Sequence, residues 1–325
     1  MSWADLFRDL AVARVARDHQ LSYFDIGTRG GFQDDLAPLG FAVDAVGFEP
    51  EPEEFARLAA ATDPRWASAR VVQQGISPEG GVLSLHMPTE NVAASLLTSD
   101  EDLGRRFSKT EFFDAGHALE IETVTLASAV RDAGVANLDY LKIDVEGAEY
   151  GIFAAAGDVM ANVLAIKTEA CWLPARTGQA LAGDLDRLLT DQGFQLMDIV
   201  YPAHWRREGD VADPLVAATS PPYSRGQLIH ADLLYFRDPA TLAERPDAAV
   251  RMALIAMAMG YFDHALMLLE APDISADLEA RYGTTVRDMV DAASRAYGRR
   301  AFGRAFRAQL RGLARFLRHL GNALR

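Results

Sequence analysis

The fold is decided by the segment Leu138-Asp139-Tyr140-Leu141-Lys142-Ile143-Asp144-Val145-Glu146-Gly147-Ala148-Glu149, in which a short apolar run ends in three carboxylates around a glycine. Short apolar runs of this kind are typical of buried parallel strands. In open α/β sheets the ligand crevice lies just beyond the carboxyl ends of such strands. We therefore expect Asp144 and Glu146 to lie at the edge of a ligand site.

On both sides of this segment, from Leu21 to about Phe236, short apolar runs alternate with helical periods. This alternation predicts a mostly parallel, doubly wound α/β sheet of the Rossmann-like type with helices on both faces. The predicted strands are Leu21–Ile26, Ala45–Phe48, Ala69–Gln73, Tyr140–Asp144, Leu164–Thr168 and Phe194–Val200. The predicted helices are Asp34–Leu39, Pro52–Ala61, Thr125–Ala133, Glu146–Ala156 and Ala180–Gln192.

Two segments interrupt this rhythm. Ser84–Glu111 mixes polar and small residues without a period, and Tyr201–Gln227 holds four prolines among clustered charges. Long irregular segments in compact domains are usually functional covers or disorder, so both are candidate lids.

The domain organisation is expected to have three parts: an N-terminal helix over residues 1–20, the α/β domain over 21–238, and an all-helical subdomain over 239–325. In the third part, helical periods lie at Asp247–Met259, Phe262–Leu269 and Ser275–Tyr297, followed by a basic amphipathic helix over 298–325.

Charge is unevenly distributed along the chain. Residues 295–325 contain nine arginines and no acid, which leaves 23 basic against 46 acidic residues in positions 1–294. A body this acidic repels nucleic-acid backbones, so we expect no nucleic-acid partner. Met1–Gln20 lacks the apolar core of an export signal. The only cysteine, Cys171, fits a reducing compartment, and a cytoplasmic protein is expected.

A glycine-rich loop, Gly27–Gly31, follows the first predicted strand, and Glu49 ends the second. Such glycines let the backbone approach a ligand, and an acid at the second strand's end can accept ribose hydroxyls. Arg29 replaces the glycine that a nicotinamide-binding fingerprint requires, which argues against an oxidoreductase. The loop instead resembles the acid-x-Gly-x-Gly-x-Gly signature of S-adenosylmethionine-dependent methyltransferases, with Asp25, Gly27 and Gly31 in register.

The segment Lys142–Glu149 resembles the hallmark of the FkbM-type methyltransferases. Phe48-Glu49-Pro50, Ser95-Leu96 and Ile121–Leu126 resemble further parts of that family, and the resemblance extends over about Ser22–Arg237. It implies a class I methyltransferase fold, S-adenosylmethionine as cofactor, and methylation of a hydroxyl on a sugar or a polyketide-like metabolite. The cofactor-binding residues expected from it are Asp25, Gly27, Thr28, Arg29, Gly31, Glu49, Pro50 and Gly75.

The carboxylates are the candidate catalytic groups, because a hydroxyl is a poor nucleophile unless a base within hydrogen-bond reach accepts its proton. Asp144 is the first choice for this base, Glu146 the second and Glu169 the third. Glu149 is expected to face solvent or to cap the following helix, where an acid is favourable. Lys142 is expected to pair with an acid. We predict no metal site, although a magnesium ion that orients the acceptor hydroxyl remains an alternative, because such a site needs only one or two carboxylates.

The C-terminal basic helix separates its apolar and charged residues at 100° per residue. One stripe holds Phe302, Phe306, Leu310, Leu313, Phe316, Leu317, Leu320 and Leu324, and the opposite face holds Arg304, Arg307, Arg311, Arg315 and Arg318. Such a helix can lie in an anionic membrane surface, at the inner face of the membrane, or can dock on the protein's own body or on another subunit of a homo-oligomer. The sequence alone leaves these alternatives open.

The leading hypothesis is therefore a cytoplasmic S-adenosylmethionine-dependent O-methyltransferase that acts on a small-molecule or glycan acceptor. Two alternatives remain. One is a non-catalytic assembly or regulatory module built on the same fold, and the other is a nicotinamide-dependent oxidoreductase.

Overall fold

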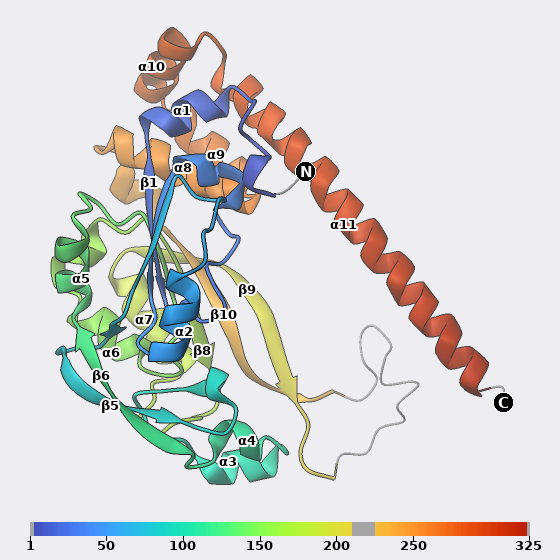
Figure 1. The fold of residues 1–325 in the computed structure, drawn as a ribbon. Coiled ribbons are helices and arrows are strands. Elements are labelled where there is room, and N and C mark those ends of the chain that lie inside the picture. Colours follow the sequence, from blue (N-terminus) through green and yellow to red (C-terminus); the bar gives the residue numbers. More distant parts are fainter. Residues whose placement is uncertain (1–2, 210–224, 324–325) are drawn as a thin grey trace.

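A seven-stranded sheet forms the centre of the molecule in the computed structural model, which describes residues 3–209 and 225–323 (Figure 1). Its strand order is β3-β2-β1-β7-β8-β10-β9. The first five of these strands pair in parallel, and β10 runs antiparallel to both of its neighbours. The predicted mostly parallel, doubly wound sheet is thus confirmed. The strands are β1 (Leu21–Ile26), β2 (Val43–Phe48), β3 (Ser68–Val72), β7 (Tyr140–Ile143), β8 (Ala165–Cys171), β9 (Phe194–Trp205) and β10 (Gln227–Arg237).

The apolar runs in the sequence are explained by burial on both faces of this sheet. Every residue of β1 and of β7 is buried. Because side chains alternate between the faces of a strand, Tyr23 and Tyr140 contribute to one core, and Phe24 and Leu141 contribute to the other. Two separate hydrophobic cores therefore clamp the central strands.

Helices cover both faces. One core includes residues of α1 (Val12–Asp18), the 3-10 helix η2 (Ala37–Ala42) and the C-terminal helices, and the other includes α5 (Leu126–Ala133), α6 (Glu149–Ala155) and α7 (Ala182–Asp191). The remaining helices of the α/β region are η1 (Trp3–Asp5), α2 (Pro52–Ala59), η3 (Asn91–Ala93), α3 (Glu101–Arg106), α4 (Thr110–Phe113), η4 (Gly157–Ala161) and η5 (Pro239–Leu242). The α-helix predicted at Asp34–Leu39 was wrong, since a 3-10 helix begins there only at Ala37.

A second, three-stranded sheet was missed by the sequence patterns. It has the order β4-β6-β5 and consists of β4 (Gly75–Ile76), β5 (Gly81–Met87) and β6 (His117–Val124). The segment Ser84–Glu111, predicted to be irregular, contains the end of β5 and the helices η3 and α3. Half of β5 is exposed, so its sequence lacks the continuous apolar run of the central strands.

The second predicted loop, Tyr201–Gln227, is also partly wrong. Tyr201–Trp205 continues β9, and β10 begins at Gln227. Residues 210–224 lie outside the described residues.

Four helices follow the sheet: α8 (Pro246–Met259), α9 (Phe262–Leu269), α10 (Pro272–Tyr282) and α11 (Val286–Ala323). The expected single helix over Ser275–Tyr297 is instead divided at Gly283, whose φ of +68° ends α10 in a left-handed conformation. In contrast, α11 is continuous beyond Tyr297 and extends away from the body as a rod (Figure 1). Among the described residues, no helix combines the length and apolar character needed to cross a membrane.

A buried ion pair joins these C-terminal helices to the central sheet. Arg251 of α8 places Nε 2.8 Å from Oδ1 of Asp139, which directly precedes β7. The other oxygen, Oδ2, accepts a hydrogen bond from the backbone N–H of Ser22 in β1, at 2.9 Å. Burial raises the pKa of Asp139, and the Arg251 guanidinium acts in the opposite direction. The pair therefore holds α8 against the start of the strand that carries Asp144.

Replacing Arg251 should destabilise the protein, because Asp139 would keep a buried charge without its partner. We predict that Arg251→Met lowers the free energy of unfolding by about 3 kcal/mol, as expected for a broken buried pair. The matched control is Arg287→Met, which removes an exposed ion pair with Glu270 and should cost less than about 1 kcal/mol. Urea denaturation followed by circular dichroism measures both, and equal effects of the two variants would contradict the role given to Arg251.

Candidate functional site

A cavity of about 940 Å³, open mouth included, lies at the carboxyl ends of β1, β2 and β7. The second sheet forms the facing wall through Ile76, Leu85 and Ile121, and Val92 and Leu96 cover it from the segment after β5. The predicted lid over Ser84–Glu111 thus does border a pocket, although it is partly regular in structure.

Gly27 brings the loop after β1 into direct contact with the end of β7. Its φ is +79°, and a Cβ atom at this position would lie 2.1 Å from the carbonyl oxygen of Asp144. Glycine is therefore required both by the backbone conformation and by the close approach. Gly31 has a φ of +107° and donates its N–H to the carbonyl of Thr28 at 2.7 Å, which closes the loop as a turn.

Lys142 connects the loop after β1 to the end of β7. Its Nζ lies 3.2 Å from Asp25 Oδ1 and 3.7 Å from Asp144 Oδ2, and it donates a hydrogen bond to the carbonyl of Gly27. Burial disfavours the ammonium, but the two carboxylates outweigh this effect and raise the pKa of Lys142. The sequence-based expectation that Lys142 pairs with an acid matches this geometry, and the pairing has two partners.

Asp25 and Thr28, two predicted cofactor residues, lie behind the cavity wall. Asp25 is completely buried and accepts hydrogen bonds from the hydroxyl of Tyr23 and the N–H of Gln33. Thr28 is 1% exposed, and its hydroxyl oxygen accepts from the N–H of Phe48 and donates to the carbonyl of Asp25. In the structure these side chains shape the loop, and neither they nor Gly31 line the cavity, so their role in cofactor binding stays a prediction.

Glu49, Arg29, Pro50 and Gly75 do line it. Glu49 ends β2 with its side chain 4% exposed, and Oε1 accepts the N–H of Glu51 at 2.9 Å. Burial raises the pKa of Glu49. Arg29 holds Nη2 3.9 Å from Glu49 and 3.6 Å from Glu51, and this nitrogen is buried without a hydrogen-bond partner among the described residues. The wall thus presents one carboxylate and one free donor.

Asp144 and Glu146 lie on the opposite wall, past the end of β7. The Asp144 side chain is 40% exposed. Glu146 has a φ of +57°, which is strained for a residue with a side chain. Two contacts hold it there: Nη2 of the buried Arg176 lies 2.9 Å from its Oε2, and the hydroxyl of Ser95 donates to its carbonyl oxygen. Glu146 is therefore fixed by a cation, whereas Asp144 is accessible from the cavity.

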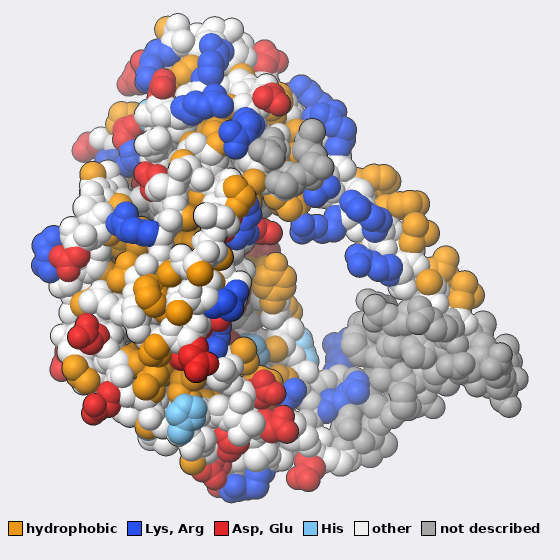
Figure 2. Space-filling model, in the orientation of Figure 1, with side chains coloured by type: hydrophobic (Ala, Val, Ile, Leu, Met, Phe, Trp, Pro, Cys, Tyr) orange, Lys and Arg blue, Asp and Glu red, His pale blue; other side chains and the backbone are white. Residues whose placement is uncertain are grey.

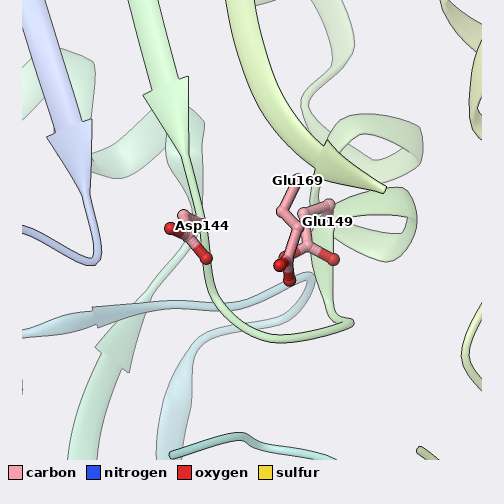
Figure 3. Close-up of side chains that lie close together, drawn as sticks. All are labelled: Asp144, Glu149 and Glu169. Carbon is pink, nitrogen blue, oxygen red and sulfur yellow. The ribbon is translucent and has the colours of Figure 1, made fainter. Parts of the chain in front are cut away.

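Carboxylate oxygens of Asp144, Glu149 and Glu169 lie within 4.8 Å of one another (Figure 3). Burial and the neighbouring carboxylates raise the pKa of Glu169 well above its usual value, and burial raises the pKa of Glu149 to about 7. Glu169, at the end of β8, also lies 2.6 Å from Nδ1 of His230 in β10. Three oxygens at this spacing could bind a cation, but the contact with His230 competes for Glu169.

The expectation that Glu149 faces solvent was wrong. It is 5% exposed, and its Oε1 accepts the backbone N–H groups of Val145 and Gly147 at 3.0 and 3.1 Å. The sequence anticipated a cap because Glu149 does begin α6, yet the groups that it binds belong to the turn before the helix. Glu149 thus fixes the turn that carries Glu146.

Arg176 and His230 were missed as site residues. Both come from segments distant in sequence, and neither forms a motif with its neighbours. Antiparallel pairing of β10 with β8 places His230 opposite Cys171, two positions beyond Glu169. No sequence pattern around Arg176 predicts its burial, because its partner Glu146 lies thirty residues away in the chain and meets it only in the folded protein.

Comparison with known proteins gives one strong match and several weak ones. The search of curated proteins found no match. The weak matches among solved structures include a precorrin-6y C5,15-methyltransferase from Geobacter metallireducens, which is 11% identical, with coverage of 70% of this chain and 86% of that one and a TM-score of 0.32. The 23S rRNA methyltransferase ErmE is 10% identical over 88% of this chain and 96% of its own, with a TM-score of 0.28.

A third solved structure, a putative methyltransferase from Thermoplasma acidophilum, is 7% identical, covers 68% of each chain and has a TM-score of 0.28. Similarities this distant do not bear on the site or the substrate. The sequence profile of the Methyltransferase FkbM domain, however, matches residues 25–196, more than half of the chain, and includes the glycine loop, Glu49 and the carboxylate cluster. The chain therefore belongs to the FkbM methyltransferase domain family.

Proposed function

We propose that the protein transfers a methyl group from S-adenosylmethionine to a hydroxyl of a carbohydrate-containing acceptor. The observation that carries this proposal is the two-sided cavity. Its first wall, Arg29 and Glu49, presents groups suited to a nucleoside, and its second wall presents the accessible carboxylate of Asp144. The family supports methyl transfer, and the cavity supports the roles of the residues.

The first wall, formed by Arg29 and Glu49 and called the donor wall below, carries groups that suit S-adenosylmethionine. Glu49 ends the second strand, where a carboxylate can accept two ribose hydroxyls. Nη2 of Arg29 makes no hydrogen bond to the described residues, although it lies 3.9 Å from Glu49 and 3.6 Å from Glu51, so the guanidinium can supply a donor for an acidic or carbonyl group of the ligand. Gly27 exposes backbone on this wall because no side chain can occupy that position. When bound, S-adenosylmethionine supplies an electrophilic methyl group on a sulfonium centre.

The second wall, which carries Asp144 and Glu146, is called the acceptor wall below. Asp144 is the proposed base on this wall. A carboxylate oxygen of Asp144, which is 40% exposed and lines the cavity, would accept the proton of the acceptor hydroxyl. Lys142, whose Nζ lies 3.7 Å from Oδ2 of Asp144, holds Asp144 in place. Glu146 and Glu169 are engaged by Arg176 and His230, so we assign them to acceptor positioning.

A carbohydrate acceptor is favoured by the density of hydrogen-bonding groups at this wall. Asp144 and Glu146 line the cavity and Glu169 lies beside Asp144, so their oxygens can accept hydrogen bonds from several hydroxyl groups at once, which suits a polyol. The indole ring of Trp205 lies 5.7 Å from the His230 ring and adds an aromatic surface near Glu169. We place the reaction in the cytoplasm, where the buried free thiol of Cys171 stays reduced.

Glu49→Gln tests the donor wall. We predict a loss of affinity for S-adenosylmethionine of about tenfold to a hundredfold, because hydrogen bonds to a charged acceptor are worth about 1.5–3 kcal/mol. Isothermal titration calorimetry with S-adenosylmethionine, its demethylated product and NAD measures the affinity and the cofactor class together. Glu53→Gln, an exposed acid at the start of α2, is the control. Preferential binding of NAD would reject the proposed function.

Asp144→Asn tests the acceptor wall. We expect the turnover number to fall by about 10²–10⁴, the usual contribution of a general base, with little change in calorimetric affinity for S-adenosylmethionine. The exposed Asp158 provides the control Asp158→Asn. Because the natural acceptor is unidentified, turnover is measured as formation of demethylated product with a panel of nucleotide sugars and lipid-linked sugars. Equal losses of binding and turnover would move Asp144 to the donor site.

Glu149→Gln tests whether Glu149 has a structural role, in contrast to the proposed base Asp144. In the folded protein the pKa of Glu149 is raised to about 7, so its protonated form is favoured and stability falls as pH rises from about 4.5 through 7. Glutamine keeps the acceptor oxygen but removes this ionisation. The variant should therefore be more stable than the wild type at pH 8, by about 1–3 kcal/mol, and equally stable at pH 4. Urea denaturation at both pH values checks this, and a loss of stability at pH 8 would contradict it.

A further inference from the structure

The outer part of α11 displays a stripe of large apolar side chains to solvent. Their exposed fractions range from 50% to 71%, and the stripe consists of Phe302, Phe306, Leu310, Leu313, Phe316 and Leu317. The last residues of α11 that pack against the hydrophobic core are Ala293, Ala296 and Tyr297. Beyond Gly298 the helix therefore carries an apolar face that contributes nothing to the packing of the body.

The arginine face of α11 is turned toward the body instead. The guanidinium groups of Arg300 and Arg304 lie 5.9 and 5.0 Å from the ring of Trp3. Figure 2 shows the same arrangement: basic side chains line the side of the rod that faces the body, and hydrophobic side chains line the outer side. The described structure thus does not bury the stripe against the protein's own surface, which was one of the open alternatives.

Charge identifies the partner that suits this face. Residues 295–325 carry nine arginines and no acidic residue. If the stripes of two copies paired, the arginines would remain on the two outer faces of the pair, and the segment would supply no carboxylate to neutralise them. An anionic lipid surface provides both an apolar layer for the phenylalanines and negative charge for the arginines.

We propose that α11 beyond Gly298 binds the surface of an anionic bilayer, with the stripe inserted at the boundary between headgroups and acyl chains. Helices with Phe and Leu on one face and Arg on the other lie in this plane. The opposite face of a helix is about 10 Å away, close to the screening length of about 8 Å at physiological salt. The long arginine side chains also extend toward the phosphates, so the attraction persists across the helix.

The rod shape of α11 supports this orientation. Residues 298–323 form about 40 Å of continuous helix at 1.5 Å per residue. Phe302 and Phe306 stack on each other with ring centroids 6.2 Å apart, which presents a broad apolar surface near the start of the segment. Because the helix extends away from the acidic body (Figure 1), it can contact a membrane without pressing that body against like charge.

The test is co-sedimentation of the full-length protein with vesicles. Vesicles of equal parts phosphatidylglycerol and phosphatidylcholine are compared with vesicles of phosphatidylcholine alone, at low and at physiological salt. The polar variant is the triple substitution Phe302→Ser, Phe306→Ser and Phe316→Ser. The control, Ala308→Ser with Ala314→Ser, adds hydroxyl groups off the stripe and leaves every large apolar side chain in place. A charge variant, Arg307→Gln with Arg311→Gln, tests the electrostatic contribution.

We expect the wild type and the control to bind anionic vesicles, and the polar variant to bind at least about tenfold more weakly at both salt concentrations. The charge variant should lose affinity mainly at low salt, where charges are least screened. Thermal unfolding of the body should be unchanged in every variant, because the altered residues lie outside the core. This readout shows that a loss of binding is not a loss of folding.

Two results would overturn the proposal. One is the absence of binding of the wild type to anionic vesicles. The other is a wild-type dimer, detected by sedimentation velocity, that the polar variant converts to monomer while neither protein binds lipid; the stripe would then join two copies of the chain. Neither result would alter the proposed methyl transfer, which is measured separately.

Discussion

The site depends on the buried ammonium of Lys142. It contacts the carboxylates of Asp25 and Asp144 and the carbonyl of Gly27, and so ties the loop after β1 to the end of β7. A buried cation is stable only when such partners replace its lost hydration. Without this centre, Gly27 would have no fixed position against the Asp144 carbonyl, and Asp25 would be a buried charge without a partner. The two walls of the cavity are therefore one electrostatic unit.

Different interactions hold the central strands and the strained turn after β7. The two hydrophobic cores hold the central strands from both faces, and the Arg251–Asp139 pair adds the C-terminal helices to this frame. The turn after β7 is less regular, since Glu146 has a positive φ. It is held by Glu149 from within and by Arg176 from outside. Glu146 and Glu169 are held by Arg176 and His230, whereas Asp144 stays exposed to the cavity, as the proposed base must be.

The sequence predicted the residues of the donor wall better than those around the acidic cluster. Gly27 and Glu49 were found because a loop and the next strand end are close in sequence and follow a common spacing. The motif did not reveal that the side chains of Asp25 and Thr28 are buried behind the cavity wall, because a motif gives positions along the chain and not the direction of a side chain. Glu149 was misjudged for the same reason: its backbone partners depend on the path of the turn. Arg176 and His230 reach the acidic cluster only through the pairing of β8 with β10 and the packing of the lid.

By itself, the sequence determined six of the seven strands of the central sheet, the family and the amphipathic nature of α11. Burial on both faces requires short apolar runs, and helical periods mark the covering helices, so local patterns suffice. Only the tertiary structure decided which carboxylates meet, which of them is accessible, and which way α11 faces. These outcomes arise from contacts between segments distant in the chain, such as Lys142 with Asp25, Glu146 with Arg176 and Arg304 with Trp3. No local pattern encodes such contacts, because their geometry exists only after the two cores have formed.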